Sequence, residues 1–426
     1  MSTSTSSPNV LISGFGIAST VFAATLLRAY PSATITIVER DPSMRLTGAS
    51  VDIRSSAVDI IKWMNHEPAI RAKTTKETGV EFVDDAGKSF ATLRATGNDN
   101  IQTMTSEYEI FRGDLARIFY KDIEGKVDVV FSETVESYVQ EKDNVHVTFS
   151  NGKAAASYDL MVAADGLGSK IRAMMLGTSV SEHIHDEGVY ASFFVIEKDL
   201  LNGSKLAKWY NTTGGRAIFL RPDPDPRGRT RGHFMNSAWP SDTASRDKIN
   251  AALRQGRESY MHLVEESFAD VGFHQTKEIL AEMRSTPDFY ASKFAQVRSP
   301  SIQDGRIVLL GDAGYACPGI GTSLAIMGGH ILAGELLRHN LDVPAATKAY
   351  EDLMLPYAKS EQSTLGDYAM QMLNPQSAWG LYVRNTILWA VTAAKIDRMA
   401  LWIMGKLGWE EKKIKMPVYP WPEVKA

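Results

Sequence analysis

Three loops in this sequence combine glycine with polar side chains, and each follows directly on an apolar run. The first loop, Gly14 to Ser19, comes after the apolar residues 10–12, and the other two begin at Asp165-Gly166 and at Gly311-Asp312. A short apolar run without alternation is typical of a strand that is covered on both faces. In open α/β sheets ligands bind outside the carboxyl ends of such strands, so these loops are candidates for a binding site.

The first loop predicts the kind of ligand. Gly14 and Gly16 are followed by Ser19 in a G-x-G-x-x-S pattern, and a helical periodicity begins at Ile17. Amide groups at a helix N-terminus, together with the helix dipole, favour an anion such as a pyrophosphate. Glu39 closes the next apolar run, 23 residues beyond Gly16, about where a carboxylate binds a ribose hydroxyl. Ser19 replaces the usual third glycine, which makes the motif less specific for a dinucleotide. The alternative interpretation is an α/β unit that binds no nucleotide.

The elements that position these loops divide the chain into two kinds of segment. Strands and helices follow one another through residues 8–176, and this α/β pattern resumes over 291–373. Between them, residues 177–290 carry longer strands and one helix-length segment, Asp247 to Phe268, and residues 374–426 are rich in tryptophan and aliphatic side chains. We therefore predict an α/β fold, in which a Rossmann-like nucleotide-binding domain is interrupted by an antiparallel β-sheet substrate domain and followed by C-terminal helices.

Composition indicates an ordinary globular protein. The 426 residues are 44% hydrophobic and 23% charged, with a net charge of -4, so two domains are expected and nucleic acid is not an expected partner. Met1 to Pro8 has neither the basic cluster nor the apolar core of a signal peptide. We therefore expect a cytoplasmic location. Cys317 is the single cysteine, which excludes an internal disulfide and a cysteine-based metal site. We expect no metal, and a monomer or a homodimer.

The C-terminal segment raises the question of a membrane. Its longest uncharged stretch, Asn385 to Ala394, has ten residues, and roughly 20 are needed to span a bilayer. Helices that pack across the two domains are therefore expected, and an interfacial membrane anchor is the alternative.

In their order and spacing, the three loops resemble the signatures of the single-component FAD-dependent aromatic hydroxylases, the family of p-hydroxybenzoate hydroxylase and of the tetracycline-inactivating monooxygenases. The resemblance covers nearly all of residues 9–345, and Gly321 to Ala325 fits the tetracycline-inactivating branch. It implies non-covalent FAD, NADPH or NADH as a transient reductant, and O2. A flavin C4a-hydroperoxide would then transfer one oxygen atom to a small multi-ring organic molecule, such as a secondary metabolite or an antibiotic, by hydroxylation or epoxidation.

The resemblance also assigns contacts to the cofactor. The first loop would hold the pyrophosphate and Glu39 the adenosine ribose, while Arg112 matches the arginine that reaches the FAD chain and Asp312 the aspartate that holds the ribitol hydroxyls. In chain order, the implied contacts are Gly14, Gly16, Ser19, Glu39, Arg40, Gly48, Ala49, Asp52, Arg112, Asp165, Gly166, Asp312 and Gly321.

Residues near the substrate are predicted as well. His233 resembles a substrate-pocket histidine of the tetracycline-inactivating enzymes, and Tyr315 stands where the family often has a histidine, so both are candidate catalytic residues. Tyr190, Arg216 and Phe219 are expected to line the same pocket, and ordinary packing or a surface position is the alternative for each.

Two other functions stay open. The loop from Cys317 to Gly321 is shorter than the family pattern, which leaves an FAD-dependent oxidase, reductase or cyclase as a second hypothesis. A non-catalytic, membrane-associated ligand-binding module that uses the tryptophan-rich C-terminus is the third.

Overall fold

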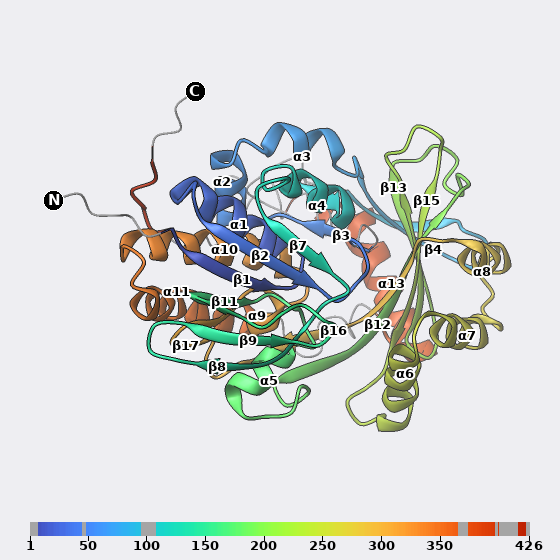
Figure 1. The fold of residues 1–426 in the computed structure, drawn as a ribbon. Helices are drawn as coiled ribbons and strands as arrows, with labels where there is room; N and C mark the ends of the chain where they lie inside the picture. The colour runs from blue at the N-terminus through green and yellow to red at the C-terminus, as the bar shows by residue number, and fades with distance from the viewer. Residues whose placement is uncertain are drawn as a thin grey trace.

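The computed structural model describes residues 7–44, 48–94, 108–364, 374–396, 399 and 416–422. Within these ranges the chain forms two layered units that lie side by side (Figure 1). One unit is built around a mostly parallel sheet and the other around a larger, mostly antiparallel sheet, as expected for an interrupted Rossmann-like fold.

The nucleotide-binding unit has a six-stranded sheet in the order β17-β18-β11-β1-β2-β7. All its pairings are parallel except that of the edge strand β17. Its strands are β1 (Asn9–Ser13), β2 (Thr34–Glu39), β7 (Asp128–Phe131), β11 (Leu160–Ala163), β17 (Gln303–Asp304) and β18 (Ile307–Leu309). Every residue of β11 and β18 is buried, which agrees with their unbroken apolar runs.

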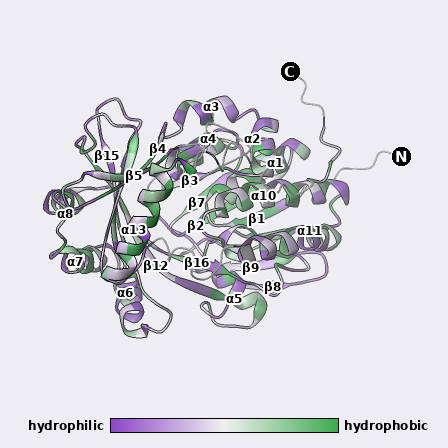
Figure 2. Ribbon diagram, turned by 180° about the vertical axis from the view of Figure 1, so that it is seen from behind, coloured by the Kyte–Doolittle hydropathy of each residue, from purple (hydrophilic) through white to green (hydrophobic). Residues whose placement is uncertain are grey.

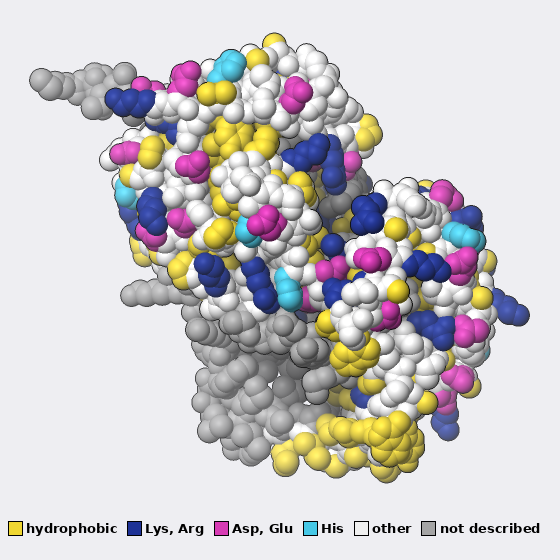
Figure 3. Space-filling view, turned by 90° about the horizontal axis from the view of Figure 1, so that it is seen from below, with side chains coloured by type: hydrophobic (Ala, Val, Ile, Leu, Met, Phe, Trp, Pro, Cys, Tyr) yellow, Lys and Arg dark blue, Asp and Glu magenta, His cyan; other side chains and the backbone are white. Residues whose placement is uncertain are grey.

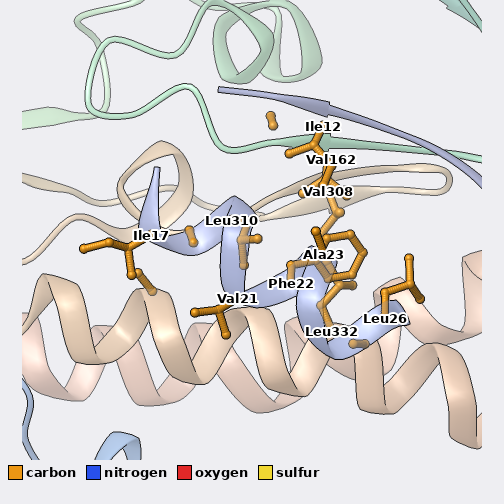
Figure 4. Packing of buried hydrophobic residues seen from close by; sticks show 14 of the residues in the cluster. Ile12, Ile17, Val21, Phe22, Ala23, Leu26, Val162, Val308, Leu310 and Leu332 are labelled. Atoms are coloured by element: carbon orange, nitrogen blue, oxygen red, sulfur yellow. The ribbon is translucent and has the colours of Figure 1, made fainter. Parts of the chain in front are cut away.

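Helix α1 (Ile17–Ala29) lies between this sheet and α10 (Gly321–Arg338), with Val21, Phe22 and Leu26 fully buried (Figure 4). The two helices approach closely because Gly329 has no side chain: a Cβ there would lie 2.9 Å from the backbone nitrogen of Phe22. This packing fixes the start of α1 at the carboxyl edge of the sheet.

Smaller elements surround this core. A three-stranded sheet packs against it through Val145, Val147 and Tyr158, and a two-stranded sheet lies toward the second unit. These elements are β8 (Val135–Gln140), β9 (Val145–Phe149), β10 (Ala156–Tyr158), β3 (Ser50–Asp52), β6 (Glu109–Phe111), α2 (Ser56–Trp63), α3 (Glu67–Lys73), α4 (Arg112–Tyr120), α5 (Lys170–Leu176), α9 (Asp312–Tyr315) and α11 (Val343–Thr364).

The second unit has a seven-stranded sheet in the order β16-β12-β15-β14-β13-β4-β5. Its elements are β4 (Gly79–Val83), β5 (Ser89–Arg94), β12 (Ile184–Ile196), β13 (Leu206–Thr212), β14 (Arg216–Pro222), β15 (Thr230–Ser237), β16 (Phe289–Val297), α6 (Thr243–Gln255), α7 (Arg257–Phe268) and α8 (Thr276–Ser285). Tyr190, Phe194 and Phe234 face the helices, whereas Ala191, Trp209 and Met235 belong to the core of the other face. This division follows from the two-residue period of a strand.

Three details of this unit differ from the sequence-based expectations. The hairpin of β4 and β5 lies within the segment 8–176, but β4 pairs in parallel with β13 and so extends the substrate sheet. Strand β16 also belongs to this sheet and runs across the expected boundary at residue 290. The single helix expected from Asp247 to Phe268 is two helices, because Gly256 takes a φ of 100° that a continuous helix cannot accommodate.

The C-terminal helix α13 (Ala378–Ala393) lies on the substrate sheet, beside β5 and β13 (Figure 2). Leu388 packs against the sheet, while Trp379, Tyr382 and Trp389 on its outer side are 72%, 65% and 58% exposed. Figure 3 shows hydrophobic side chains gathered along one edge of the molecule. Leu401 and the residues that follow it lie outside the described part until residue 416. Among the described helices, none has the length and hydropathy needed to cross a bilayer.

Tyr315 belongs to the core of the nucleotide-binding unit. Its hydroxyl lies 2.8 Å from the hydroxyl of Tyr350 on α11, and Tyr350 donates to the carbonyl oxygen of Leu309 at 3.2 Å. Tyr315 is 1% exposed, and burial raises its pKa to about 12. The expected catalytic role is inconsistent with this position, because the hydroxyl of Tyr315 is buried in the protein interior and is already paired.

Replacing Tyr315 by phenylalanine removes one buried hydrogen bond but leaves that of Tyr350 to Leu309. We expect a loss of about 1 kcal/mol in the free energy of unfolding, with unchanged FAD content. Urea denaturation and the absorbance of the purified protein measure the two quantities. Tyr350→Phe is the matched comparison and should cost more, because it leaves two polar groups unpaired. If Tyr315→Phe were as stable as the wild type but transferred oxygen poorly, a purely structural role of Tyr315 would be contradicted.

Candidate cofactor and substrate site

The loops after β1, β11 and β18 meet at two adjoining cavities of about 570 Å³ and about 260 Å³. Both cavities are lined by Ile17, Arg40, Arg112 and Asp165, so they form one continuous cleft. The smaller cavity extends toward Glu39 and the larger toward the substrate sheet. The polar loops found in the sequence are therefore brought together.

The first loop depends on the absence of a side chain at Gly14. This residue has a φ of 100°, and a Cβ there would lie 2.4 Å from the carbonyl oxygen of Ala164 at the end of β11. Ser19, at the place of the third glycine, is buried and is paired within the first turn of α1. Its hydroxyl accepts from the Gly16 amide at 2.8 Å and donates to the Gly16 carbonyl at 2.7 Å. The serine is thus accommodated without disturbing the loop.

Glu39 ties the end of β2 to this loop. Its carboxylate accepts hydrogen bonds from the amide of Phe15 at 2.7 Å and from the amide of Asp41 at 3.0 Å. The same carboxylate lines the smaller cavity, where it retains acceptor capacity for a ligand hydroxyl. The side chain of Arg40 is 71% exposed at the mouth of the cleft.

Arg112 occupies the junction of the two cavities. Its amide donates to the carbonyl of Ala49 at 3.1 Å, which holds the start of α4 against the loop before β3. Its stem passes Gly48, and its guanidinium would be 3.8 Å from a Cβ placed on Gly16. A fixed guanidinium beside the N-terminus of α1 is well placed for a phosphate.

Two aspartates provide acceptors on the opposite wall. Asp165 accepts from the amide of Lys170 at 3.2 Å through Oδ2, and burial raises the pKa of its carboxyl group. Its buried Oδ1 has no partner among the described residues. Asp312 starts α9, and its Oδ1 would be 3.3 Å from a Cβ on Gly321. Buried acceptors are normally paired, so the orphaned oxygen of Asp165 fits a ligand hydroxyl such as those of FAD.

The predicted cofactor contacts largely coincide with this cleft. Gly14, Gly16, Glu39, Arg40, Ala49, Asp52, Arg112, Asp165, Asp312 and Gly321 line one cavity or both. Ser19, Gly48 and Gly166 are not among the lining residues. Ser19 stabilises the first turn of α1, and Gly48 makes room for the Arg112 stem. Gly166 has a φ of 81°, which suits the turn after β11.

The wall opposite the cofactor loops is an aromatic face of the substrate sheet. Phe193, Trp209 and Phe219 line the larger cavity with His233. The ring of His233 meets those of Phe193 and Phe219 edge-on, at centroid distances of 5.0 and 5.5 Å. Burial lowers the pKa of His233 well below 6.5, and the charge of Arg221 lowers it further. The imidazole is therefore neutral at physiological pH.

Tyr190 and Arg216 lie on the other face of the sheet, which corrects their assignment to the pocket. They precede Phe193 and Phe219 by three positions, and an odd spacing along a strand points side chains in opposite directions. Tyr190 is buried beneath the helices, with its hydroxyl 3.3 Å from Asp186, and Arg216 pairs with Asp270.

Several lining residues were not predicted from the sequence, among them Trp209, Arg221 and Glu109. Arg221 follows Phe219 by two positions, so the strand period was a signal that it shares the pocket face. Trp209 and Glu109 reach the cavity through strand pairings that no local pattern predicts. Cys317 also lines the larger cavity, and burial raises the pKa of its thiol to about 12.

Comparison with known proteins finds relatives over nearly the whole chain, although no family model matches it. The FAD-dependent monooxygenase asL6 of Sarocladium schorii is 30% identical over 437 residues, covering 98% of this chain and 99% of the relative. Monooxygenase CTB7 of Cercospora beticola is 30% identical over 423 residues, covering 97% and 98%.

Among solved structures, the tetracycline destructase Tet(55) superposes with a TM-score of 0.72 at 29% identity, covering 97% of this chain and 99% of that one. The similarity to these proteins thus extends over nearly the full length of the chain in sequence and in fold. This chain belongs to the FAD-dependent monooxygenases of the single-component flavin hydroxylase type.

Proposed function

We propose that this enzyme uses NAD(P)H and O2 to insert one oxygen atom into a compact multi-ring organic molecule, by hydroxylation or epoxidation. The observation that carries the proposal is the composition of the larger cavity, where the cofactor loops face an aromatic sheet surface across one space. Bound FAD supplies the redox chemistry, and the protein supplies orientation and a water-poor environment. The name of the structural neighbour, a tetracycline destructase, supports a multi-ring substrate.

The cofactor would lie along the cleft with its adenosine in the smaller cavity. The amides at the start of α1 and the guanidinium of Arg112 bind the pyrophosphate, and Glu39 accepts from the ribose hydroxyls. Asp165 and Asp312 accept from the ribitol chain. The ring end then lies toward the substrate sheet, because the larger cavity extends in that direction.

The substrate would lie against the aromatic face. Phe193, Trp209 and Phe219 offer flat apolar surfaces to fused rings, which would displace water from this wall when the substrate binds. His233 is one of the polar groups of this sheet that line the cavity, together with Arg221 and Tyr290, and in its neutral form one ring nitrogen accepts a hydrogen bond while the other donates. It would orient a phenolic or enolic hydroxyl of the substrate.

The reaction itself is tested by oxygen labelling. Purified protein should carry FAD, be bleached by NADPH or NADH, and place one atom of labelled O2 in the product when a polycyclic phenol is turned over. Unlabelled product that still depends on the flavin would favour the oxidase, reductase or cyclase alternative, and absence of bound flavin would sink the proposal.

The role of Arg112 is tested by Arg112→Ala. Loss of a charge-assisted contact to phosphate should weaken FAD binding by about 10- to 100-fold, measured by fluorescence titration of the apoprotein. Arg117 is exposed on the same helix and gives the control variant Arg117→Ala, which should bind FAD normally. Equal affinities of the two variants would refute the assignment.

His233→Phe keeps an aromatic ring in the pocket but removes both nitrogen atoms. With a hydroxylated substrate we expect KM to rise about tenfold, which corresponds to one lost hydrogen bond, while FAD affinity stays constant. Because His233 is already neutral, the wild-type KM should be flat between pH 6.5 and about 8 if this residue alone governs it. His146→Asn, at an exposed position on β9, is the control. An unchanged KM in His233→Phe would exclude the contact.

A further inference from the structure

Five ionisable side chains form a cluster where the two units meet at the wall of the larger cavity. We call it the junction cluster: Asp52 on β3, Arg54 just after it, Glu77 before β4, Glu109 on β6 and Arg221 on β14. Asp52, Glu109 and Arg221 line the cavity, while the Glu77 side chain is 1% exposed behind them. The cluster thus connects the cofactor side of the cavity to the substrate sheet.

Arg221 is the centre of this cluster. Its Nε lies 2.8 Å from Glu77 and its Nη2 lies 2.5 Å from Glu109, and its Nη1 donates to the hydroxyl of Ser50. Ser50 in turn donates to Glu109 at 2.8 Å. Glu109 therefore receives two hydrogen bonds on one oxygen.

Asp52 is held less completely. Its Oδ2 lies 2.9 Å from Arg54, and its Oδ1 is buried without a partner among the described residues. One carboxylate oxygen of Glu77 and one of Glu109 are likewise buried and unpaired within the described part of the chain. A buried acceptor without a donor is costly, and among the described residues no donor reaches these three oxygens, so a proton on one of the carboxyl groups would relieve part of this cost.

The charges lead to the same conclusion. Among the described residues of the cluster, three carboxyl groups face two guanidinium groups, so full ionisation of these five side chains would leave one excess negative charge at the cavity wall. A single proton on one carboxyl group removes this charge and also supplies a donor. The groups that act on Asp52 are Arg54 from its own loop, Glu109 from β6 and Arg221 from β14.

The pKa values agree with a shared proton. Burial, followed by the charge of Glu109, raises the pKa of Asp52 to about 6 against the opposing effect of Arg54. Burial raises the pKa of Glu77 to about 7, with Arg221 lowering it and Glu109 and Asp52 raising it. The neighbouring histidine, His233 on β15, is neutral and adds no charge.

We propose that the junction cluster stores one exchangeable proton at the cavity wall and that Asp52 passes it into the cavity during turnover. Delivery of the proton by Asp52 rests on the proposed monooxygenase function, whereas its storage does not. In that reaction NAD(P)H and the substrate each give two electrons to O2, one oxygen atom enters the substrate and the other leaves as water. Each turnover consumes one proton, which the cluster donates and then recovers from solvent.

The stored proton is tested on the holoenzyme by thermal unfolding between pH 5 and 8. A carboxyl group whose pKa is raised on folding stabilises the protein at low pH, and this stabilisation is lost as the pH rises through the folded-state pKa, here about 7 for Glu77. Glu77→Gln cannot ionise, so its Tm should match the wild type at pH 5 and exceed it at pH 8. Glu278→Gln, at a surface ion pair with Lys198, should follow the wild type. A Glu77→Gln curve parallel to the wild type would overturn the storage of a proton.

Infrared titration of the wild type gives an answer that does not depend on any variant folding. The carbonyl band of a protonated carboxyl group should disappear between pH 5 and 8, and Asp52→Asn or Glu77→Gln should diminish it. If the wild type shows no such band, all three carboxyl groups are ionised and the proposal fails.

Delivery of the proton is tested with Asp52→Asn. At equal FAD content and equal rates of reduction by NAD(P)H, this variant should form product at least about tenfold more slowly and release more H2O2, with an altered pH profile and solvent deuterium isotope effect. Glu278→Gln is again the control. Normal coupling and an unchanged pH profile in Asp52→Asn would refute delivery and leave the monooxygenase function intact. Failure of the wild type to place labelled oxygen in product would refute that function and leave the infrared result as the test of the stored proton.

Discussion

The backbone of Gly14 passes the carbonyl oxygen of Ala164 at a distance that admits no side chain, and the rest of the cofactor cleft follows from that approach. Because the loop after β1 crosses the end of β11 there, α1 begins at the carboxyl edge of the sheet with its first amides directed at the cleft. Glu39 stabilises the same loop from β2, and Arg112 reaches it from α4. Gly329 contributes from behind, since it lets α10 press α1 against the sheet.

The substrate side is governed by a different constraint, the alternation of side chains across a strand. One face of the seven-stranded sheet is covered by α6, α7 and α8, and the other contributes Phe193, Trp209 and Phe219 to the cavity. The aromatic face is flat and its imidazole is neutral, but Arg221 and Lys293 also line the cavity, so this wall combines apolar and charged surface. Shape and polarity of this wall therefore bear on substrate choice, while the redox chemistry belongs to the cofactor.

The junction cluster brings these two halves of the cavity together at a cost in stability. A buried ion network of this kind contributes little to the free energy of folding compared with well-packed apolar residues. Its position explains why it is useful: Arg221 comes from the substrate sheet, and Asp52 and Glu109 come from the small sheet beside the cofactor loops. A single proton at this place would couple the net charge of the cluster to proton transfer into the cavity.

A feature of the structure could be predicted from the sequence when the residues that indicate it lie close together along the chain. The glycine loop and the buried strands β1, β11 and β18 were predicted because their signals lie within a few residues of one another. The same locality explains the resemblance to flavin hydroxylases, which rests on three short loops, and the comparisons confirm both the family and the fold.

Tertiary structure alone decided which side chains meet. The parallel pairing of β4 with β13 joins residues far apart in sequence, so no local pattern predicts that the hairpin completes the substrate sheet. Tyr190 and Arg216 were assigned to the pocket although their strand positions turn them away from it, and Tyr315 was assigned a catalytic role although its hydroxyl pairs with that of Tyr350. The sequence by itself determined the loops that could hold a dinucleotide. The burial and proximity that give Asp52, Glu109 and Arg221 a shared chemistry arise only when separate strands fold against one another.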